Sequence, residues 1–407
     1  MVRYGIALML AGAILMAACG APTEDSISGP TPPPSSVDRS ASFGPTTETR
    51  THEPAVDLGE VQFGTSGWKT DFSKHSVPLD EIIPGGPPRD GIPPIDDPKF
   101  ESVEKADSWL ESQEPVVLLE VGRDARAFPL QILLWHEIVN DVAGGVPVTV
   151  TFCPLCNTAI AFDRRVAGRT LDFGTSGNLR NSDLVMWDRQ TESWWQQVTG
   201  KAIVGDLTGK GLTMLPTTII PWKEFRRQFP EGRVLSRDTG HRRSYGANPY
   251  AGYDKVDEPP FLFEGKLDGR LPPKERVVTI SLSGEDAAYP FSILAKERVI
   301  TDSVGGQPIV VVYQPGTASA LDASSIAASR DVGAAGVYRP EVDGRRLTFS
   351  WHESGFVDAE TGSRWTVLGR AIDGPLAGKA LEPVVHANHF WFAWAAFKPD
   401  TRIYGSG

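Results

Sequence analysis

The alternation of apolar and polar residues is clearest on either side of a pair of cysteines. Apolar residues alternate with threonines from Val148 to Phe152, and the alternation resumes from Ile160 to Phe162. A period of two residues is typical of a strand. The intervening Cys153-Pro154-Leu155-Cys156 is therefore predicted to be a tight turn between two strands.

The pattern of apolar positions also repeats along the chain. Val116–Val121 is matched by Val277–Leu282, at an offset of 277 − 116 = 161 residues, and the offset holds over the segment that follows. A later segment that begins at Gly200 matches one that begins at Gly369, at an offset of 369 − 200 = 169. Similarity at a fixed spacing predicts two homologous domains.

The order of elements within each repeat indicates an α+β fold that consists mainly of antiparallel strands with short helices. Each repeat begins with a strand, and the helices that follow are predicted at Pro129–Asn140 and Pro290–Glu297. We expect a first domain with an N-terminal extension over residues 56–254, carrying the cysteine turn, and a second domain without cysteines over residues 255–407. No Gly-rich phosphate loop supports a nucleotide-binding fold.

Residues 1–19 have the pattern of a secretory signal peptide, in which a positive charge precedes an apolar run and small residues. Leu15–Cys19 resembles a bacterial lipobox, which implies that Cys19 becomes lipidated; cleavage without modification is the alternative. Residues 20–55 are rich in Pro, Ser and Thr and are predicted to be a flexible tether. We therefore expect a membrane-anchored lipoprotein of the cell envelope, outside the cytoplasm.

Size and charge narrow the choice of partners. A chain of 407 residues exceeds the size at which one core usually stops growing, which agrees with two domains. The net charge of −11 and the lack of a long basic run exclude nucleic acid as a partner, since nucleic acid requires a basic surface.

Four motifs are distinctive in combination, and they are Leu134–Asp141, the cysteine turn, Phe173–Asp183 and Tyr245–Tyr250. Together they resemble a secreted prokaryotic family catalogued as domain of unknown function 3179. The resemblance extends over residues 67–404 and implies an extracytoplasmic location. It implies no reaction, and whether the protein is an enzyme stays open at this point.

Three interpretations of Cys153 and Cys156 are open. An oxidising compartment favours a short disulfide. Two adjacent thiolates also suit a metal knuckle that binds Zn²⁺ or a softer ion such as Cu(I). A dithiol that cycles with partner proteins is the third, although the segment after Cys156 does not begin the helix that lowers thiol pKa values in such motifs.

Three histidines are candidate metal ligands. His136 lies on the predicted helix before the turn, and a buried structural role is the alternative for it. His386 and His389 are three residues apart, a spacing that allows two rings to contact one metal. Capping of the helix that follows is the alternative for this pair.

A polar loop and a group of tyrosines between the repeats are candidates for a ligand site. Turn hydrogen bonds and packing between domains are the structural alternatives. The candidate residues are Ser176, Asn178, Arg180, Asn181, Asp183, Tyr245 and Tyr250.

The second repeat has Gln314 and Thr317 where the first has cysteines, and Pro315-Gly316 between them predicts the same turn without sulfur. The cysteines therefore indicate a function of the first repeat alone. We expect a thiol-centred site that binds a transition metal, zinc or copper, or acts as a dithiol/disulfide redox centre at the cell envelope. The alternative is a non-catalytic module that binds a small molecule or another envelope protein.

Overall fold

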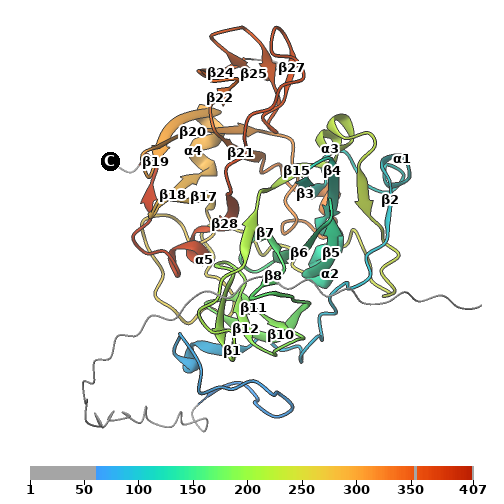
Figure 1. Ribbon diagram of the computed structural model, residues 1–407, viewed down its shortest axis with the longest axis vertical. Coiled ribbons are helices and arrows are strands. Elements are labelled where there is room, and N and C mark those ends of the chain that lie inside the picture. Colours follow the sequence, from blue (N-terminus) through green and yellow to red (C-terminus); the bar gives the residue numbers. More distant parts are fainter. Residues whose placement is uncertain (1–60, 353–354, 406–407) are drawn as a thin grey trace, which may run out of the picture. The chain divides into compact units, whose positions relative to one another are not determined.

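Short, mainly antiparallel strands are the commonest regular element of the molecule, because apolar and polar residues alternate only over brief runs (Figure 1). The computed structural model describes residues 61–352 and 355–405, all within one compact unit, residues 54–407. The fold is 10% helix and 41% strand, so the prediction of mainly antiparallel strands with few short helices is confirmed. The predicted signal peptide and Cys19 lie outside the described residues. Within the described ranges, no helix has the length and apolar character needed to span a membrane.

The helical elements are η1 (Leu79–Glu81), α1 (Val103–Ala106), α2 (Leu130–His136), α3 (Trp222–Gln228), α4 (Phe291–Glu297), η2 (Ile326–Ala328) and α5 (Trp391–Ala395). The strands up to the middle of the chain are β1 (Ile82–Pro84), β2 (Phe100–Ser102), β3 (Pro115–Val121), β4 (Asp124–Pro129), β5 (Ile138–Ala143), β6 (Val146–Cys153), β7 (Thr158–Asp163), β8 (Arg165–Val166), β9 (Arg169–Thr170), β10 (Phe173–Arg180), β11 (Asp183–Asp188), β12 (Trp194–Gln196), β13 (Lys201–Val204), β14 (Thr213–Leu215), β15 (Thr217–Pro221) and β16 (Arg233–Leu235). The later strands are β17 (Arg276–Leu282), β18 (Glu285–Pro290), β19 (Val299–Val304), β20 (Gln307–Gln314), β21 (Ala334–Tyr338), β22 (Glu341–Val342), β23 (Arg345–Arg346), β24 (Phe349–His352), β25 (Gly355–Asp358), β26 (Arg364–Trp365), β27 (Ala371–Asp373), β28 (Ala387–Phe390) and β29 (Arg402–Ile403).

Two sheets have the same order of corresponding strands. The first has the order β15-β3-β4-β16-β2, and the second has the order β28-β17-β18-β29. In the β3–β4 hairpin Val116 lies opposite Pro129, and in the β17–β18 hairpin Val277 lies opposite Pro290. A seven-residue helix follows each hairpin. The two hairpins are thus separated by the offset that the apolar pattern predicts.

Helix α2 is shorter than predicted and ends at His136. The next residue, Glu137, has a left-handed backbone conformation with φ of 57°, which ends the helix. Ile138–Ala143 then forms β5 and pairs with β6. The spacing of apolar residues up to Asn140 is compatible with a helix, but pairing with β6 decides the outcome.

The turn that follows β6 differs from the one that follows β20. Cys153 pairs with Thr158 across the β6–β7 turn, as predicted. Gln314 pairs instead with Ala334, so the prediction that the second repeat makes the same short turn is wrong. The inserted loop, residues 315–333, is held by the Asp331 carboxylate, which accepts hydrogen bonds from backbone N–H groups at the start of the loop.

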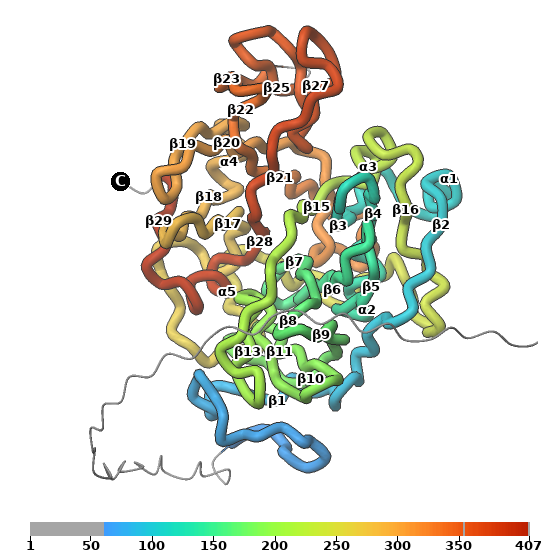
Figure 2. Tube along the Cα trace, in the orientation of Figure 1, coloured from blue at the N-terminus to red at the C-terminus, as the bar shows by residue number. Residues whose placement is uncertain are grey.

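The closing strand of each sheet packs against the other half of the chain. Strand β28 pairs with β17 and lies against β7, whereas β15 pairs with β3 and lies against β21. Figure 2 shows the trace of β28 passing beside β7. Val116 and Leu118 of the first sheet share one apolar core with Val310 and Trp365 from the later part of the chain.

Two fully buried aspartates organise corresponding hairpins. Asp188 accepts hydrogen bonds from the backbone N–H and hydroxyl of Thr191 and from the indole of Trp195, at 2.7, 2.9 and 2.9 Å. Asp358 accepts the three corresponding hydrogen bonds, from the backbone N–H and hydroxyl of Thr361 and from the indole of Trp365, at 2.7, 2.8 and 2.9 Å. Each carboxylate therefore satisfies donors that would otherwise be buried without a partner.

We predict that Asp188→Ala and Asp358→Ala each lower the free energy of unfolding by about 2–4 kcal/mol, because each leaves buried donors unsatisfied. Denaturant unfolding of the two variants measures the loss. Asp238→Ala is the matched control: its carboxylate is exposed and contacts Lys99 only at the surface, so the change should stay within about 0.5 kcal/mol. A loss of that small size in Asp188→Ala would contradict the assigned role.

Candidate functional site

Cys153 and Cys156 lie at the two ends of the turn between β6 and β7. Asn157, directly after the second cysteine, has a left-handed φ of 52°, and its N–H donates to the carbonyl of Pro154 at 3.2 Å. Asparagine tolerates this conformation better than most residues. The turn therefore brings both sulfur atoms to the same side of the sheet, where both are buried free thiols.

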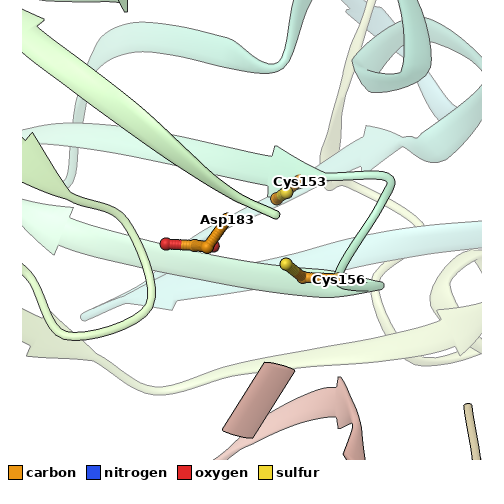
Figure 3. A group of neighbouring side chains, drawn as sticks. All are labelled: Cys153, Cys156 and Asp183. Carbon is orange, nitrogen blue, oxygen red and sulfur yellow. The ribbon is translucent and has the colours of Figure 1, made fainter. Parts of the chain in front are cut away.

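The hairpin β10–β11 supplies the third component of the site. Asn181 and Ser182 form its tight turn, with φ of 53° and 65°. This turn directs the carbonyl of Ser182 at the cysteines. The carbonyl oxygen accepts hydrogen bonds from both thiols, at 3.7 Å from Cys153 Sγ and 3.4 Å from Cys156 Sγ. The side chain of Asp183 follows directly and lies beside the two sulfur atoms (Figure 3).

The two thiols and the Asp183 carboxylate form a compact donor group. One ligand atom from each residue lies within 4.8 Å of the other two, and all three residues are buried. Asp183 Oδ2 accepts from the side-chain amide of Gln196 at 2.6 Å and from the N–H of Val198 at 3.0 Å. Asp183 Oδ1 is buried and has no hydrogen-bond partner among the described residues. One carboxylate oxygen is therefore free to bind something else.

Burial dominates the electrostatics of this group. It raises the pKa of Cys153 and raises that of Cys156 well above its usual value. Burial likewise raises the pKa of Asp183 to about 7. No lysine, arginine or histidine of residues 61–352 and 355–405 forms an ion pair with Asp183 or with the neighbouring Glu137. Without a cation, the two thiols keep their protons at neutral pH, and Asp183 titrates in that range.

Glu137 is a fourth acidic group at this site. Two main-chain hydrogen bonds hold its left-handed backbone. Its N–H donates to the carbonyl of Leu133, and its carbonyl accepts from the N–H of Phe152, both at 2.8 Å. Arg298, the corresponding residue in the second half, has a φ of 65° and the same two backbone bonds. Left-handed conformations are costly for residues with long side chains, so the surrounding structure imposes this one. Burial, and then the charge of Asp183, raise the pKa of Glu137 to about 8.

A cavity of about 400 Å³, which we call the cysteine cavity, adjoins the donor group. Glu137 and Cys153 line it together with Asn178, Leu184 and apolar residues. It contains no lysine, arginine or histidine in its wall. One end of the cavity is thus acidic and the rest is largely apolar.

The segment between the two halves of the chain closes this cavity. Tyr250 and Tyr253 line it, and the hydroxyl of Tyr253 donates to the carbonyl of Leu155 in the cysteine turn at 3.0 Å. On the opposite side Gly177 approaches the backbone so closely that a Cβ would lie 2.2 Å from the carbonyl oxygen of Pro87. Glycine at this position is therefore required for the wall to close.

His136 is not part of the donor group. Its Nδ1 lies 2.7 Å from the carbonyl of Pro93, and its Nε2 lies 2.6 Å from the hydroxyl of Tyr245. Burial lowers the pKa of His136 to about 4, so Nδ1 carries the proton and Nε2 accepts from the tyrosine. Both nitrogens are used within the protein, as in the structural alternative for this residue.

His389 lies on β28 and His386 directly precedes that strand, and neither imidazole belongs to the donor group. His386 Nδ1 donates to the carbonyl of Val384 at 2.7 Å, and His389 Nδ1 lies 2.7 Å from the hydroxyl of Thr158. Both line a second cavity. The metal-ligand group found in the described residues contains neither of them.

The residues of the predicted ligand loop have separate roles in the structure. Ser176 donates to the carbonyl of Val185 at 2.5 Å, and Arg180 pairs with Glu81. Asn178 lines the cysteine cavity, whereas Asn181 forms the hairpin turn. Of the two tyrosines, Tyr250 lines the cavity and Tyr245 contacts His136.

Sequence reasoning missed two features of the site. Asp183 was predicted as a ligand-binding residue of the polar loop but not as a neighbour of the cysteines, and Glu137 was not identified as a site residue. Asp183 is about thirty residues from the cysteines, and only the pairing of β10 with β11 brings it to them. Glu137 follows a short helix in an apolar segment, and no spacing pattern distinguishes it from a surface glutamate at a helix end.

One comparison with known proteins gives a match. A family model described as "Protein of unknown function (DUF3179)" matches residues 89–401, which include both buried cysteines, Glu137 and Asp183. No curated protein matches the chain, and no solved structure does.

We predict that Glu137→Gln stabilises the metal-free protein at neutral pH and leaves it nearly unchanged at about pH 4.5. The pKa of Glu137 is about 8 in the folded state against an ordinary 4.5, so the folded state retains a proton that the unfolded state loses in between. Stability contributed by this proton is present below about pH 4.5 and is lost as the pH rises toward 8. Glutamine has no such proton, so the free energy of unfolding of the variant should exceed that of the wild type at pH 7 by on the order of 3 kcal/mol.

Denaturant unfolding of chelator-treated protein at both pH values measures this difference. Glu104→Gln is the control, because Glu104 is an exposed residue of α1 and should show no pH-dependent effect. Equal effects of Glu137→Gln at the two pH values would contradict the raised pKa.

Proposed function

Because the chain belongs to the family of proteins of unknown function catalogued as DUF3179, we propose its function from the geometry of its own site: it holds a transition-metal ion between Cys153, Cys156 and Asp183. The observation that carries the proposal is the donor group itself. Three atoms that are good metal ligands lie within 4.8 Å of one another, and one of the carboxylate oxygens has no other partner. Buried polar atoms without a partner are uncommon in native proteins.

Charge gives a second argument for a cation. Four acidic groups, the two thiols and the carboxyls of Asp183 and Glu137, are buried together, and no described basic side chain pairs with the two carboxyls. Ionised groups in such a place are costly unless they are paired or bind a metal. A divalent ion would replace the protons of Cys153, Cys156 and Asp183 and balance most of the charge that they then carry.

The mixture of ligand types favours zinc over copper. Zn²⁺ accepts thiolate, imidazole and carboxylate ligands together, usually in a tetrahedral arrangement. Cu(I) prefers sulfur ligands alone, and the carboxylate of Asp183 is a poor match for it. We therefore propose Zn²⁺, held by two sulfur atoms and one oxygen.

The proposed centre is of the open kind. Three protein ligands leave a fourth position, and Cys153 contributes both to the donor group and to the wall of the cysteine cavity. Catalytic and ligand-binding zinc sites keep a position open in this way, whereas structural sites are closed by four protein ligands. In such a position zinc polarises a bound ligand or lowers the pKa of a bound water. Glu137, also in the cavity wall, has a pKa raised to about 8 by burial and would serve as a proton donor there at neutral pH.

Burial argues against the two other interpretations of the cysteines. Reactive dithiols are partly exposed and have lowered thiol pKa values. Both thiols here are at most 2% exposed, and burial raises both pKa values. The carbonyl of Ser182 contacts both sulfur atoms as free thiols rather than as a disulfide.

A non-catalytic binding module is the second candidate. The cysteine cavity favours it, since about 400 Å³ of largely apolar space is sufficient for a small organic molecule. The absence of a basic side chain from its wall makes such a ligand neutral or cationic. The ligand is a small molecule or the side chain of another envelope protein.

We also propose that the chain arose by an internal duplication and that the site belongs to one copy. The support is the common order β15-β3-β4-β16 and β28-β17-β18-β29, and the left-handed residue that follows α2 and α4. The second copy has Gln314 and Arg298 where the first has Cys153 and Glu137. The two copies thus share a scaffold and differ in the residues of the proposed centre.

We predict that the purified full chain binds about one zinc ion and that Cys153→Ser and Asp183→Asn each lose most of it. Removing one of three protein ligands leaves too few to hold the ion. Mass spectrometry of metals in reduced, dialysed protein measures the stoichiometry. Asp206→Asn is the control, since Asp206 is an exposed carboxylate that contacts only Lys74. Equal metal content in the wild type and Cys153→Ser would exclude this centre.

The double variant Cys153→Ala with Cys156→Ala should bind no zinc and remain folded. Loss of two buried sulfur atoms costs about 2 kcal/mol, well below the 5–15 kcal/mol that is typical of native proteins. A far-UV circular dichroism spectrum like that of the wild type, with no metal bound, would separate a functional centre from a structural one. Unfolding of the variant would show that the metal serves folding.

The location of the protein is a further part of the proposal. A lipid on Cys19 would anchor the chain to a membrane of the cell envelope, outside the cytoplasm, through the tether of residues 20–55. In a bacterial host that processes lipoproteins, we expect the chain in the membrane fraction and Cys19→Ser in the soluble fraction. Equal fractionation of the two would contradict the anchor.

A further inference from the structure

A second cavity, of about 460 Å³, lies between the two halves of the chain, and we call it the histidine cavity. Both halves contribute to its wall: Val198 and Lys201 come from the first, and His389 and Trp394 from the second. It shares no lining residue with the cysteine cavity, although His389 contacts Thr158, whose hydroxyl lies 3.2 Å from the carbonyl of Cys156. Three of its properties together indicate the kind of molecule that it would bind.

The first property is an unpartnered imidazole nitrogen. His389 is 1% exposed, and its Nε2 has no hydrogen-bond partner among the described residues. His389 Nδ1 lies 2.7 Å from the hydroxyl oxygen of Thr158, which also lies 3.2 Å from the carbonyl of Cys156. Nε2 is thus a buried imidazole nitrogen without a partner among the described residues. A ligand hydroxyl satisfies such a nitrogen in either tautomer, because a hydroxyl both donates and accepts hydrogen bonds.

The second property is the charge of the rim. Lys201 and Lys398 line the cavity, and no aspartate or glutamate does. Lys398 is neutralised by Asp286, at 3.0 Å. Lys201 is exposed and has no acidic partner among the residues that the structure describes. In a chain with a net charge of −11, this rim therefore retains one unpaired positive charge.

The third property is a largely apolar wall. Trp394, Phe397, Ile160 and Met214 contribute to it, together with the hydroxyl-bearing residues Thr199, Thr279 and Ser281. Val385, also in the wall, is 37% exposed, which is unusual for a valine in this otherwise buried region. The aromatic or aliphatic part of a ligand would cover this surface, and removal of both apolar surfaces from water would favour binding.

We propose that the histidine cavity binds a small organic acid with an apolar body, whose carboxylate lies at Lys201 and whose hydroxyl hydrogen-bonds to His389 Nε2. His389 is 1% exposed whereas Lys201 is exposed, so one polar group of the ligand lies inside the cavity and the other lies at its opening. A hydroxyl at one end and a carboxylate at the other is the simplest chemistry that satisfies both. The occupant is therefore an aromatic or aliphatic hydroxy acid.

Three naphthalene probes separate the contributions: 6-hydroxy-2-naphthoate has both polar groups, 2-naphthoate lacks the hydroxyl, and 2-naphthol lacks the carboxylate. Titration of the full chain, followed by probe fluorescence, should give the tightest binding for the hydroxynaphthoate. We expect about a tenfold weakening for each of the other two, since each loses one polar contact. Added salt should weaken binding of the two carboxylates and not that of the naphthol.

Two variants assign the binding to this cavity. Lys201→Glu replaces attraction by repulsion and should weaken hydroxynaphthoate binding at least about tenfold, while naphthol binding stays within about twofold. Lys210→Ala, an exposed lysine outside the cavity wall, is the matched control and should change neither. The same titration on the double variant Cys153→Ala with Cys156→Ala should match the wild type, because the cysteine cavity is separate.

Three results would overturn the proposal. They are no saturable binding of hydroxynaphthoate up to about 1 mM, equal binding of naphthol and hydroxynaphthoate, and an unchanged affinity in Lys201→Glu. Loss of hydroxynaphthoate binding in the double cysteine variant would place the probe in the other cavity and would equally exclude this one.

Discussion

The contact between β28 and β7 is the interaction on which the rest of the arrangement depends. The N–H of Phe390 donates to the carbonyl of Cys156 at 2.8 Å, and His389 contacts Thr158 on the other side of the same turn. The cysteine turn of the first half is thus completed by the last strand of the second. Tyr253, from the segment that connects the halves, holds the turn at Leu155. No part of the site is formed by neighbouring residues alone, and this explains how a four-residue turn is held rigidly enough to present two sulfur atoms together.

Low dielectric surroundings then give the site its chemistry. Burial raises the pKa values of Cys153, Cys156 and Asp183, so without a metal the two thiols are neutral at pH 7 and Asp183 is only partly ionised. The same burial makes a bound cation strongly preferred over ionised groups without one. The histidine cavity shows the opposite arrangement, with a neutral inner imidazole and an unpaired lysine at its rim. Two cavities of opposite character lie on either side of the segment around Thr158.

Local patterns allowed prediction of the strands, the cysteine turn and the spacing of the two hairpins. The alternation from Val148 to Phe152 predicts a strand correctly, although the structure buries both of its faces, the threonines as fully as the apolar residues. The site itself was only half predicted. The cysteines are adjacent in the sequence, but Asp183 joins them through a hairpin turn and Glu137 through a backbone conformation. Both depend on tertiary contacts that have no local signature. The early end of helix α2 and the inserted loop after Gln314 were mispredicted for the same reason. In both segments the pairing of strands outweighs the local preference of the sequence.

The left-handed residue after each seven-residue helix has a consequence for how this architecture can change. Glu137 and Arg298 hold the same backbone conformation, although one is acidic and the other basic and neither favours it. The guanidinium of Arg298 stacks on Tyr313 and Trp351, whereas Glu137 lines a cavity. The hydrogen bonds that fix this position are all from the main chain, so its side chain can be exchanged without loss of the scaffold. The fold therefore provides this left-handed position in both halves, although only the first half combines it with the short turn that brings two cysteines together.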